Sequence, residues 1–456
     1  MARMRISQLA QATGGAPVGD DVEFLRVTTD SRKLQAGDLF VALRGPNFDG
    51  HRFAGSAGEQ GAVAALVSEP LAGDLPHVRV SDTRAALGSL ASWWRSRFDL
   101  PVVGITGSNG KTTCKEMVAA ILRQRGPVLA TRGNLNNDIG LPLTLLDLNE
   151  SHAYAVIEMG ANHPGEIAYL THIAKPDVAL LNNAGRAHLE GFGSLEGVAR
   201  AKGEIFSGLS ADGIAVLNRD DRFYPLWREV IGSRPYVDFG IHPEALVRAA
   251  TDQVPLLRDD LGLSQQFTIH GVGADRPVNL RLAGAHNLRN ALAASAVAKA
   301  LEIPAADIVD GLESMRPVAG RLNPRLAPNG ALVIDDTYNA NPDSLDAALA
   351  SLSALHGPRW LVLGDMGELG PEAAELHRAM GEAARAAGLQ RLFATGPLSR
   401  HAVGSFGAGA RHFPDTDALS AAINAGLRAD TIVLVKGSRA QRMERVVASL
   451  CGGGEG

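Results

Sequence analysis

The sequence predicts an α/β protein of three domains: a central domain with a phosphate-binding loop on a mostly parallel sheet, a small N-terminal α/β domain, and a Rossmann-like C-terminal α/β domain. The chain has 456 residues, more than one hydrophobic core usually serves. Strand-like apolar runs alternate with helical stretches along most of it, a pattern typical of a buried parallel sheet. A helical stretch that ends before Pro101 and a Pro-containing linker near residue 316 divide the chain. We therefore predict domains over residues 1–98, 99–315 and 316–456.

The N-terminal domain is predicted from two short apolar runs, DLFVAL and GAVAALV, which Gly- and Asp-rich turns separate. They indicate strands of a small α/β unit. The stretch RAALGSLASWWRSRF then has apolar residues at helical spacing and predicts a helix that ends this domain.

In the central domain, strands are predicted at PVVGIT, YAVIEMG, DVALLNN and GIAVLN, with helices between them. Alternation in QFTIHGV and VNLRLAG, within residues 243–284, predicts antiparallel strands, and a long Ala-rich helix, NLRNALAASAVAKALE, follows. After the linker MRPVAGRLNPRLAPNG, the runs ALVIDD, WLVLGD, RLFATG and TIVLVKG predict a second parallel sheet. These runs define the C-terminal domain.

Composition excludes several classes of protein. Hydrophobic residues make up 45% and charged residues 20% of the chain, which is ordinary for a globular protein and excludes disorder. The net charge of -5 provides no basic field for nucleic acid. The two cysteines, Cys114 and Cys451, suggest neither a disulfide framework nor a zinc site. Without a signal peptide or a run of roughly 20 apolar residues, we expect a cytoplasmic protein with no membrane span.

The stretch VVGITGSNGKTTCKEM, residues 102–117, has the context of a phosphate-binding loop. The standard signature would place a Gly at Ile105, but here the spacing is tighter. Backbone N–H groups at the helix start would hold phosphate oxygens, Lys111 would neutralise them, and a Thr hydroxyl would join Mg²⁺. The candidate loop is Gly107, Ser108, Asn109, Gly110, Lys111, Thr112 and Thr113. The alternative is a structural turn into a helix.

An acidic residue at the end of a neighbouring parallel strand usually accompanies such a loop. Glu158 follows three apolar residues in AVIEMGANHPGEI, where ligands gather in open α/β sheets. We favour a Mg²⁺ ligand over a surface glutamate at this position. His188 and Lys202 come later, and taken alone each is more often structural than functional.

Two polar clusters allow a structural or a binding interpretation. Asn287 and Asn290 lie three residues apart at a predicted helix start, where they would cap the helix or read a base edge. Asp336, Asn339 and Asn341 follow a strand in VIDDTYNANPDS, where they form a turn or part of a site.

Taken together, the motifs resemble those of the Mur ligases, the ATP-dependent amide-forming enzymes of peptidoglycan precursor synthesis. The resemblance covers nearly the whole chain and includes the tight loop, so the short spacing resembles the family's own phosphate loop. It is carried by TTDSRKLQAGDLFVALRGPNFDGHRF, TGSNGKTT, GNLNNDIGLPLTLL, EMGANHPGEI, NNAGRAHLEGFGS, AKGEI, HNLRNALAA, DDTYNANPDS, GDMGELG and VKGSR. It implies three domains that bind the UDP-sugar peptide, ATP and the incoming amine.

The resemblance also implies roles for single residues. Catalytic or metal-binding roles fall on Lys111, Thr112, Glu158, His188 and Lys202, the last matching a lysine that is typically carbamylated in this family. Roles toward ATP fall on the loop residues and on Asn287, Asn290, Arg321 and Asp336. Roles toward the other substrates fall on Ser31, Arg32, Asn134, Asn137, Asn339 and Asn341.

Within the family, the resemblance implies a monomer that uses ATP and Mg²⁺ to join D-alanyl-D-alanine to UDP-N-acetylmuramoyl-tripeptide through an acyl phosphate. One alternative is a sibling that adds a single amino acid, either a diamino-acid-adding Mur ligase or a folylpolyglutamate synthase. The diamino-acid ligase usually carries an Asp-Asn-Pro-Arg motif, which this sequence lacks. Another alternative is a nucleotide-regulated binding protein without chemistry.

Overall fold

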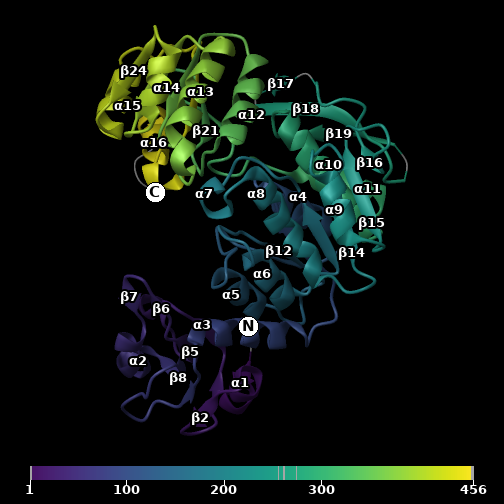
Figure 1. Cartoon of the computed structure of the whole chain (residues 1–456), viewed down its shortest axis with the longest axis vertical. Coiled ribbons are helices and arrows are strands. Elements are labelled where there is room, and N and C mark those ends of the chain that lie inside the picture. Colours follow the sequence, from purple (N-terminus) through teal and green to yellow (C-terminus); the bar gives the residue numbers. More distant parts are fainter. Residues whose placement is uncertain (1–2, 255, 260–261, 274, 453–456) are drawn as a thin grey trace.

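The computed structural model describes residues 3–254, 256–259, 262–273 and 275–452. Three larger sheets, of five, seven and six strands, follow one another along the described chain, and we call the parts built on them the N-terminal, central and C-terminal units. Figure 1 shows the N-terminal unit in purple at one end, the central unit in teal, and the C-terminal unit in green and yellow at the other end. The three-domain α/β fold is therefore confirmed.

The N-terminal unit is built on a small mixed sheet. Its strand order is β2 (Ala16–Val18), β9 (His77–Arg79), β8 (Ala62–Val67), β5 (Asp38–Val41) and β4 (Arg26–Thr28). Only β2 runs antiparallel to its neighbour in this sheet. Helix α3 (Thr83–Arg95) begins at Asp82, whose carboxylate accepts hydrogen bonds from the backbone of Arg84 and Ala85, as an N-cap does. This helix leads into the central unit.

The central unit holds the predicted parallel sheet. Its order is β11 (Val128–Ala130), β12 (Tyr154–Glu158), β10 (Val102–Thr106), β13 (Val178–Leu181), β14 (Ile214–Asn218), β15 (Tyr236–Gly240) and β16 (Val247–Arg248), all in parallel pairs. Val103 and Ile105 pack on one face with α4 (Lys111–Leu122) and α10 (Ala285–Ala300). Val102 and Ile157 pack on the other. Helices thus cover both faces of a buried sheet, which explains the continuous apolar runs in its strands.

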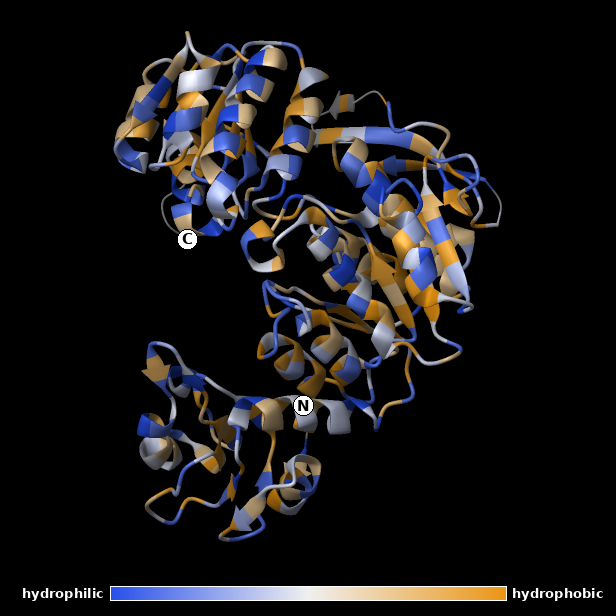
Figure 2. Ribbon diagram, viewed as in Figure 1, coloured by the Kyte–Doolittle hydropathy of each residue, from blue (hydrophilic) through white to orange (hydrophobic). Residues whose placement is uncertain are grey.

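The predicted antiparallel strands and the long helix are also confirmed. Strands β17 (Leu256–Asp259), β18 (Gly262–Ile269) and β19 (Arg276–Leu280) pair antiparallel, and α10 follows them. Helix α11 (Ala305–Ser314) then packs against α4 with α10. Figure 2 shows hydrophobic colours concentrated on the strands of the central sheet.

The C-terminal unit contains the second predicted parallel sheet, with one difference. Its order is β20 (Asn323–Leu326), β21 (Leu332–Asp336), β25 (Ile432–Lys436), β22 (Arg359–Leu363), β23 (Arg391–Thr395) and β24 (Ala410–Phe413). Strand β20 lies inside the predicted linker and pairs antiparallel with β21. A tight turn makes this pairing possible, and Gly330 adopts φ 92 there, a conformation that glycine tolerates best.

The two junctions between units differ in chemistry. Leu87 and Leu90 of α3 belong to the same buried cluster as Leu145 of α5 (Gly140–Leu146) and Ile173 of α6 (Glu166–Ala174). The N-terminal unit therefore shares its hydrophobic core with the central unit. At the end of α3, the buried Arg95 guanidinium donates to backbone carbonyls that include Ala174 O at 3.2 Å.

The C-terminal unit has hydrophobic clusters of its own, on both faces of its sheet. Hydrogen bonds and ion pairs link it to the central unit, as described below. None of the helices in the described ranges is long and apolar enough to cross a membrane.

Candidate active site

A cavity of about 840 Å³ lies where the central and C-terminal units meet, at the carboxyl ends of the central strands. Most of the predicted site residues line it: Ser108, Asn109, Gly110, Lys111, Thr112, Thr113, Asn134, Asn137, Glu158, His188, Asn287, Asn290, Arg321, Asp336, Asn339 and Asn341. Ligands bind at this edge in open parallel sheets. Gly107, Lys202, Ser31 and Arg32 are not part of the lining.

The phosphate loop joins β10 to α4, as predicted from its glycines. Gly107 and Gly110 adopt φ 155 and φ 78, and a Cβ at Gly110 would lie 2.5 Å from Asn290 Oδ1. Lys111 Nζ donates to Gly107 O at 2.7 Å and to Ser108 O at 3.3 Å. Burial lowers the pKa of Lys111. The cation is thus held by loop carbonyls and is desolvated at the start of a helix, where an anion would be favoured.

Two asparagines that the sequence analysis did not select hold this loop in place. Asn182 Nδ2 donates to Asn109 O at 3.0 Å, and Asn183 Oδ1 accepts from Asn109 N at 2.8 Å. Ser108 N also donates to Asn183 O. Both asparagines directly follow β13, so the signal was the polar pair at the end of the apolar run DVALLNN.

Glu158 is buried at the end of β12 and links two elements of the cavity. Thr112 Oγ1 donates to its Oε2 at 2.9 Å, and Asn136 Nδ2 donates to its Oε1 at 2.8 Å. The residues predicted from the sequence were its neighbours Asn134 and Asn137. Asn137 Oδ1 accepts from the backbone at the start of α5, while Asn134 is exposed at the cavity rim.

Lys202 lies in α8 (Leu195–Gly203), just outside the cavity lining, and its side chain is fully buried. Its Nζ has no hydrogen-bond partner in the described structure and lies 5.4 Å from the centre of the Phe192 ring. Burial, and then the nearby charge of Lys111, lower the pKa of Lys202 to about 7. A fraction of the side chain is therefore an uncharged amine at neutral pH.

His188 adopts φ 57 directly before the short helix α7 (Leu189–Phe192). Its Nδ1 lies 2.5 Å from Oε2 of Glu368 in the C-terminal unit. The contact is close enough for an ion pair, although no described residue has hydrogen-bond alignment with Nδ1. The contact with His188 lowers the pKa of Glu368.

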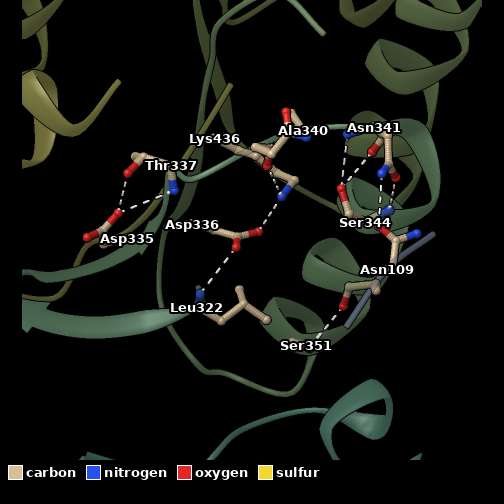
Figure 3. Close-up of polar contacts among 12 residues, drawn as sticks. Asn109, Leu322, Asp335, Asp336, Thr337, Ala340, Asn341, Ser344, Ser351 and Lys436 are labelled. Carbon is tan, nitrogen blue, oxygen red and sulfur yellow. Dashed lines mark hydrogen bonds and ion pairs between the residues drawn. The ribbon is translucent and has the colours of Figure 1, made fainter. Parts of the chain in front are cut away.

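On the C-terminal side, Asp336 ends β21 and forms a fixed polar cluster (Figure 3). Its Oδ2 lies 2.5 Å from Lys436 Nζ, and its Oδ1 accepts from Leu322 N at 3.2 Å. Lys436 Nζ also donates to Asn339 O at 3.1 Å. The cluster therefore presents an anion and a cation from neighbouring strands.

Asn341 connects the C-terminal unit to the phosphate loop (Figure 3). Its Oδ1 accepts from Ser344 N and caps α12 (Pro342–Ser353), and its Nδ2 donates to Asn109 Oδ1 at 2.8 Å. Both ends of this amide therefore have protein partners. Asn339, in contrast, is exposed, and within the described residues its side chain makes a single hydrogen bond, which Oδ1 accepts from Ala340 N.

Two arginines bridge the same units. Arg321 Nη2 donates to Thr112 Oγ1 at 2.9 Å, and its guanidinium lies 4.3 Å from the centre of the Tyr338 ring. Arg186 pairs with Asp343 at 2.6 Å and with Asp346 at 2.8 Å. Sequence analysis found Arg321, but Arg186 carries no local signal because its partners are distant in the chain.

Asn287 and Asn290 are both buried and hydrogen-bonded near the start of α10. Asn287 Nδ2 donates to Ala283 O at 2.7 Å, and Asn290 Oδ1 accepts from Asn182 Nδ2 at 3.0 Å. Beside them, burial lowers the pKa of His286 to about 4, so this imidazole is neutral at physiological pH. All three side chains are uncharged at physiological pH and line the cavity, as does the neighbouring Arg289.

Ser31 and Arg32 lie in a short 3-10 helix of the N-terminal unit and are not brought to the cavity. Arg32 is strongly exposed and pairs with Asp30 at 2.8 Å. Any role of these two residues therefore concerns a part of a ligand that extends beyond the cavity.

Family models match three parts of the chain. A Mur ligase family catalytic domain matches residues 23–95, a Mur ligase middle domain matches residues 105–298, and a Mur ligase glutamate ligase domain matches residues 320–439. The three matches follow the order of the three sheets.

Individual relatives match over the whole length. The UDP-N-acetylmuramoyl-tripeptide–D-alanyl-D-alanine ligase of Escherichia coli is 46% identical over 452 residues, which are 99% of each chain. A crystal structure of MurF from Acinetobacter baumannii superposes with a TM-score of 0.92 at 38% identity and covers 99% of both chains. The MurF ligase of Thermotoga maritima, solved in complex with ADP, superposes with a TM-score of 0.83 at 30% identity and covers 94% of this chain and 97% of its own.

Proposed function

The chain belongs to the Mur ligase family, and from this premise we propose that it joins D-alanyl-D-alanine to UDP-N-acetylmuramoyl-tripeptide at the expense of ATP. The product is a precursor of peptidoglycan, and ADP and phosphate are released. One observation carries the proposal at the level of the site: Thr112 of the phosphate loop contacts Glu158 on one side and Arg321 of the C-terminal unit on the other. Groups from both units thus meet at the phosphate loop, as they would if a nucleotide bound between the two units.

The energetic problem of the reaction is the formation of an amide from a carboxylate in water. The tripeptide carboxylate attacks the γ-phosphorus of ATP, so that a bond to ADP breaks and an acyl phosphate forms. The amine of the dipeptide then attacks the acyl carbon to give a tetrahedral intermediate. The amine nitrogen loses a proton, the bond to phosphate breaks, and the amide remains. Two anions must meet in the first step, and Lys111 and Arg321 offset that charge.

The residues around Glu158 suit a divalent cation. Glu158 and Thr112 offer the oxygen ligands that Mg²⁺ prefers, and we assign them with His188 and Lys202 to the metal sites. In the described ranges there is no cluster of three or more His, Cys, Asp or Glu side chains that would suit a metal. A modified lysine resolves this shortage of ligands. When bound, Mg²⁺ supplies neutralisation of the phosphate charge.

Lys202 has the properties that carbamylation requires. The uncharged amine adds to CO₂ and loses one proton, and the product is a carbamate whose oxygens resemble a carboxylate. A pKa of about 7 supplies the uncharged amine at neutral pH, and the buried Nζ has no competing hydrogen-bond partner among the described residues. We propose a carbamate at this position whose oxygens would help to hold Mg²⁺, in keeping with the family resemblance.

The remaining assignments follow the three units. We propose that residues 1–98 hold the UDP-sugar part of the precursor through Ser31 and Arg32, and that residues 99–315 hold ATP. The uncharged amides of Asn287 and Asn290 suit adenine, and Asp336, which also lines the cavity, would face the nucleotide from residues 316–456. Asn134 and Asn137, at the rim of the cavity, contact the peptide part of the precursor. We expect a monomeric enzyme.

The acceptor site is assigned to the loop that contains Asn339 and Asn341. An uncharged dipeptide side chain needs no ion-pair partner, whereas a diamino acid would require charged groups for its extra ammonium and carboxylate. Because Asn341 is occupied as a cap and as a partner of Asn109, the exposed Asn339 amide is the better candidate for direct contact with the dipeptide.

The decisive experiment supplies ATP, Mg²⁺ and UDP-N-acetylmuramoyl-tripeptide, and then offers D-alanyl-D-alanine, free D-alanine or diaminopimelate in turn. Phosphate release and the mass of the product are measured. We expect an amide product with the dipeptide alone. A product with a free amino acid and none with the dipeptide would assign the chain to a sibling ligase, and nucleotide binding without any product would indicate a binding protein.

A further inference from the structure

Two residues with unusual backbone conformations meet at the junction of the central and C-terminal units. His188 has φ 57 and Glu368 has φ 60, and Nδ1 of the first lies 2.5 Å from Oε2 of the second. Residues other than glycine rarely adopt this left-handed region, and where they do the conformation is often tied to function. Here both partners of one contact adopt it.

The backbone reinforces the same contact. Glu190 N, in α7, donates to Glu368 O at 3.4 Å, so Glu368 meets the His188 segment through its side chain and its main chain. Gly370, two residues further, lies against Glu190, where an added Cβ would be 3.6 Å from the Glu190 backbone. The approach of the two loops is therefore close along several residues.

The loop that carries Glu368 is anchored within the C-terminal unit. The carboxylate of Asp365 accepts from the backbone of Ser399 at 2.7 Å, and Met366 N donates to His377 Nε2 at 3.0 Å. Leu369 is buried in the hydrophobic cluster of this unit. Glu368 is therefore fixed relative to the rest of the C-terminal unit. Its contact with His188 forms only when the C-terminal unit is docked on the central unit.

We propose that Glu368 is a positioning residue that orients the His188 ring and thereby prepares it to bind a divalent cation only when the C-terminal unit is docked. Contact at Nδ1 leaves Nε2 as the nitrogen that offers a lone pair to a metal. Carboxylates commonly orient metal-binding histidines in this way, and their loss typically lowers metal affinity 10- to 100-fold. The inference rests on the proposed function, because His188 is a metal ligand only there.

The test measures Mn²⁺ binding and needs no turnover. Free Mn²⁺ is followed by electron paramagnetic resonance during titration of the full-length protein, with a non-hydrolysable ATP analogue present and the other substrates absent. The variants are Glu368→Gln, His188→Ala, the double variant, and Glu372→Gln as a matched control. Glu372 is an exposed glutamate that follows the same loop and makes no ion pair in the described structure. Thermal melting verifies that each variant is folded.

We expect Glu368→Gln to weaken the affected Mn²⁺ site about tenfold, and Glu372→Gln to leave it unchanged. The double variant should bind Mn²⁺ as His188→Ala does, because Glu368 acts through the ring that is already removed. Should Glu368→Gln fail to fold, Glu368→Asp provides the same comparison. This variant keeps the negative charge but moves the carboxylate away from His188 by the length of one methylene group.

Two results would overturn the inference in distinguishable ways. If His188→Ala weakens Mn²⁺ binding and Glu368→Gln does not, Glu368 has no positioning role and the proposed function is untouched. If His188→Ala leaves Mn²⁺ binding unchanged, the metal role of His188 in the proposed function is wrong, and the inference falls with it.

Discussion

Lys202→Met is expected to make the ligand-free protein more stable while it abolishes the proposed chemistry. The side chain of Lys202 is fully buried and its Nζ has no hydrogen-bond partner in the described structure. Burying an unpaired ammonium is costly, so the folded protein holds this lysine at the expense of stability. Methionine fills a similar volume without a charge.

The magnitude follows from the pKa of Lys202, which falls from its ordinary value of 10.5 to about 7. At about 1.36 kcal/mol per pH unit, the difference corresponds to at most ~5 kcal/mol of lost stability. Replacement by methionine recovers part of this lost stability. We therefore expect the free energy of unfolding to rise by ~2–4 kcal/mol, or the melting temperature by roughly 4–16 °C for a unit of this size. The buffer must be free of CO₂, since a carbamate would replace the amine.

The pH dependence supplies the check on this reasoning. Between pH 7 and pH 10.5 the unfolded chain binds more protons at Lys202 than the folded chain, so the stability of the wild type rises with pH across that window. The advantage of Lys202→Met is therefore largest at pH 7 and below, and shrinks toward pH 10.5. The exposed Lys33→Met serves as a control and should show neither effect.

Calorimetric melting at pH 7 and pH 9 measures both expectations. A Lys202→Met protein that melts below the wild type in CO₂-free buffer at pH 7 would refute the reasoning. A difference between the two proteins that is the same at both pH values would refute it as well.

Three further predictions concern the cavity. Lys111→Ala should lower phosphate release about 10³-fold and leave calorimetric binding of the UDP-sugar tripeptide within twofold; a joint loss would mean that the loop supports the fold. Asn136→Ala removes a hydrogen bond to Glu158 and should raise the Mg²⁺ concentration for half-maximal activity about tenfold, and an unchanged value would contradict its role. Gly110→Ala should lower the melting temperature and abolish nucleotide binding, because its Cβ would lie 2.5 Å from Asn290 Oδ1. Gly407 has the same φ of 78 but no atom within 4 Å of an added Cβ, so the control Gly407→Ala should retain nucleotide binding. Equal nucleotide binding by these two glycine variants would show that the steric conflict is unimportant.

The features that the sequence predicted well are those that depend on local pattern. Strands such as β10 and β12 are apolar on both faces because helices cover both, and the glycines at positions 107 and 110 mark a turn that other residues would strain. The resemblance to the Mur ligases added roles that no single residue indicated, above all for His188 and Lys202. Most residues selected in this way line one cavity.

The features that were missed depend on distant contacts or on a shift of one residue. In the run NLNND, sequence pattern does not distinguish Asn136, which donates to Glu158, from Asn137, whose Oδ1 accepts from Gly140 N at the start of α5. Arg186 and Glu368 meet partners in another unit, and such contacts follow from how whole units dock. The antiparallel strand β20 was hidden because it contains Pro324 and lies in a stretch whose prolines and glycines are typical of a linker.

The shared core of the N-terminal and central units has a consequence for synthesis of the chain on the ribosome. The apolar face of α3, with Leu87 and Leu90, is complete early, but its partners Leu145 and Ile173 are added much later. At roughly 5–20 residues per second, this face stays uncovered for some seconds, which is long enough for chaperones to bind or for neighbouring nascent chains to associate. The cores of the C-terminal unit lie within that unit, and they also close late, because Leu332 of β21 shares its buried cluster with Leu434 of β25. A ribosome that stalls before Ile173 therefore leaves the apolar face of α3 uncovered, whereas a chain released near residue 315, between the central and C-terminal units, has that face already covered.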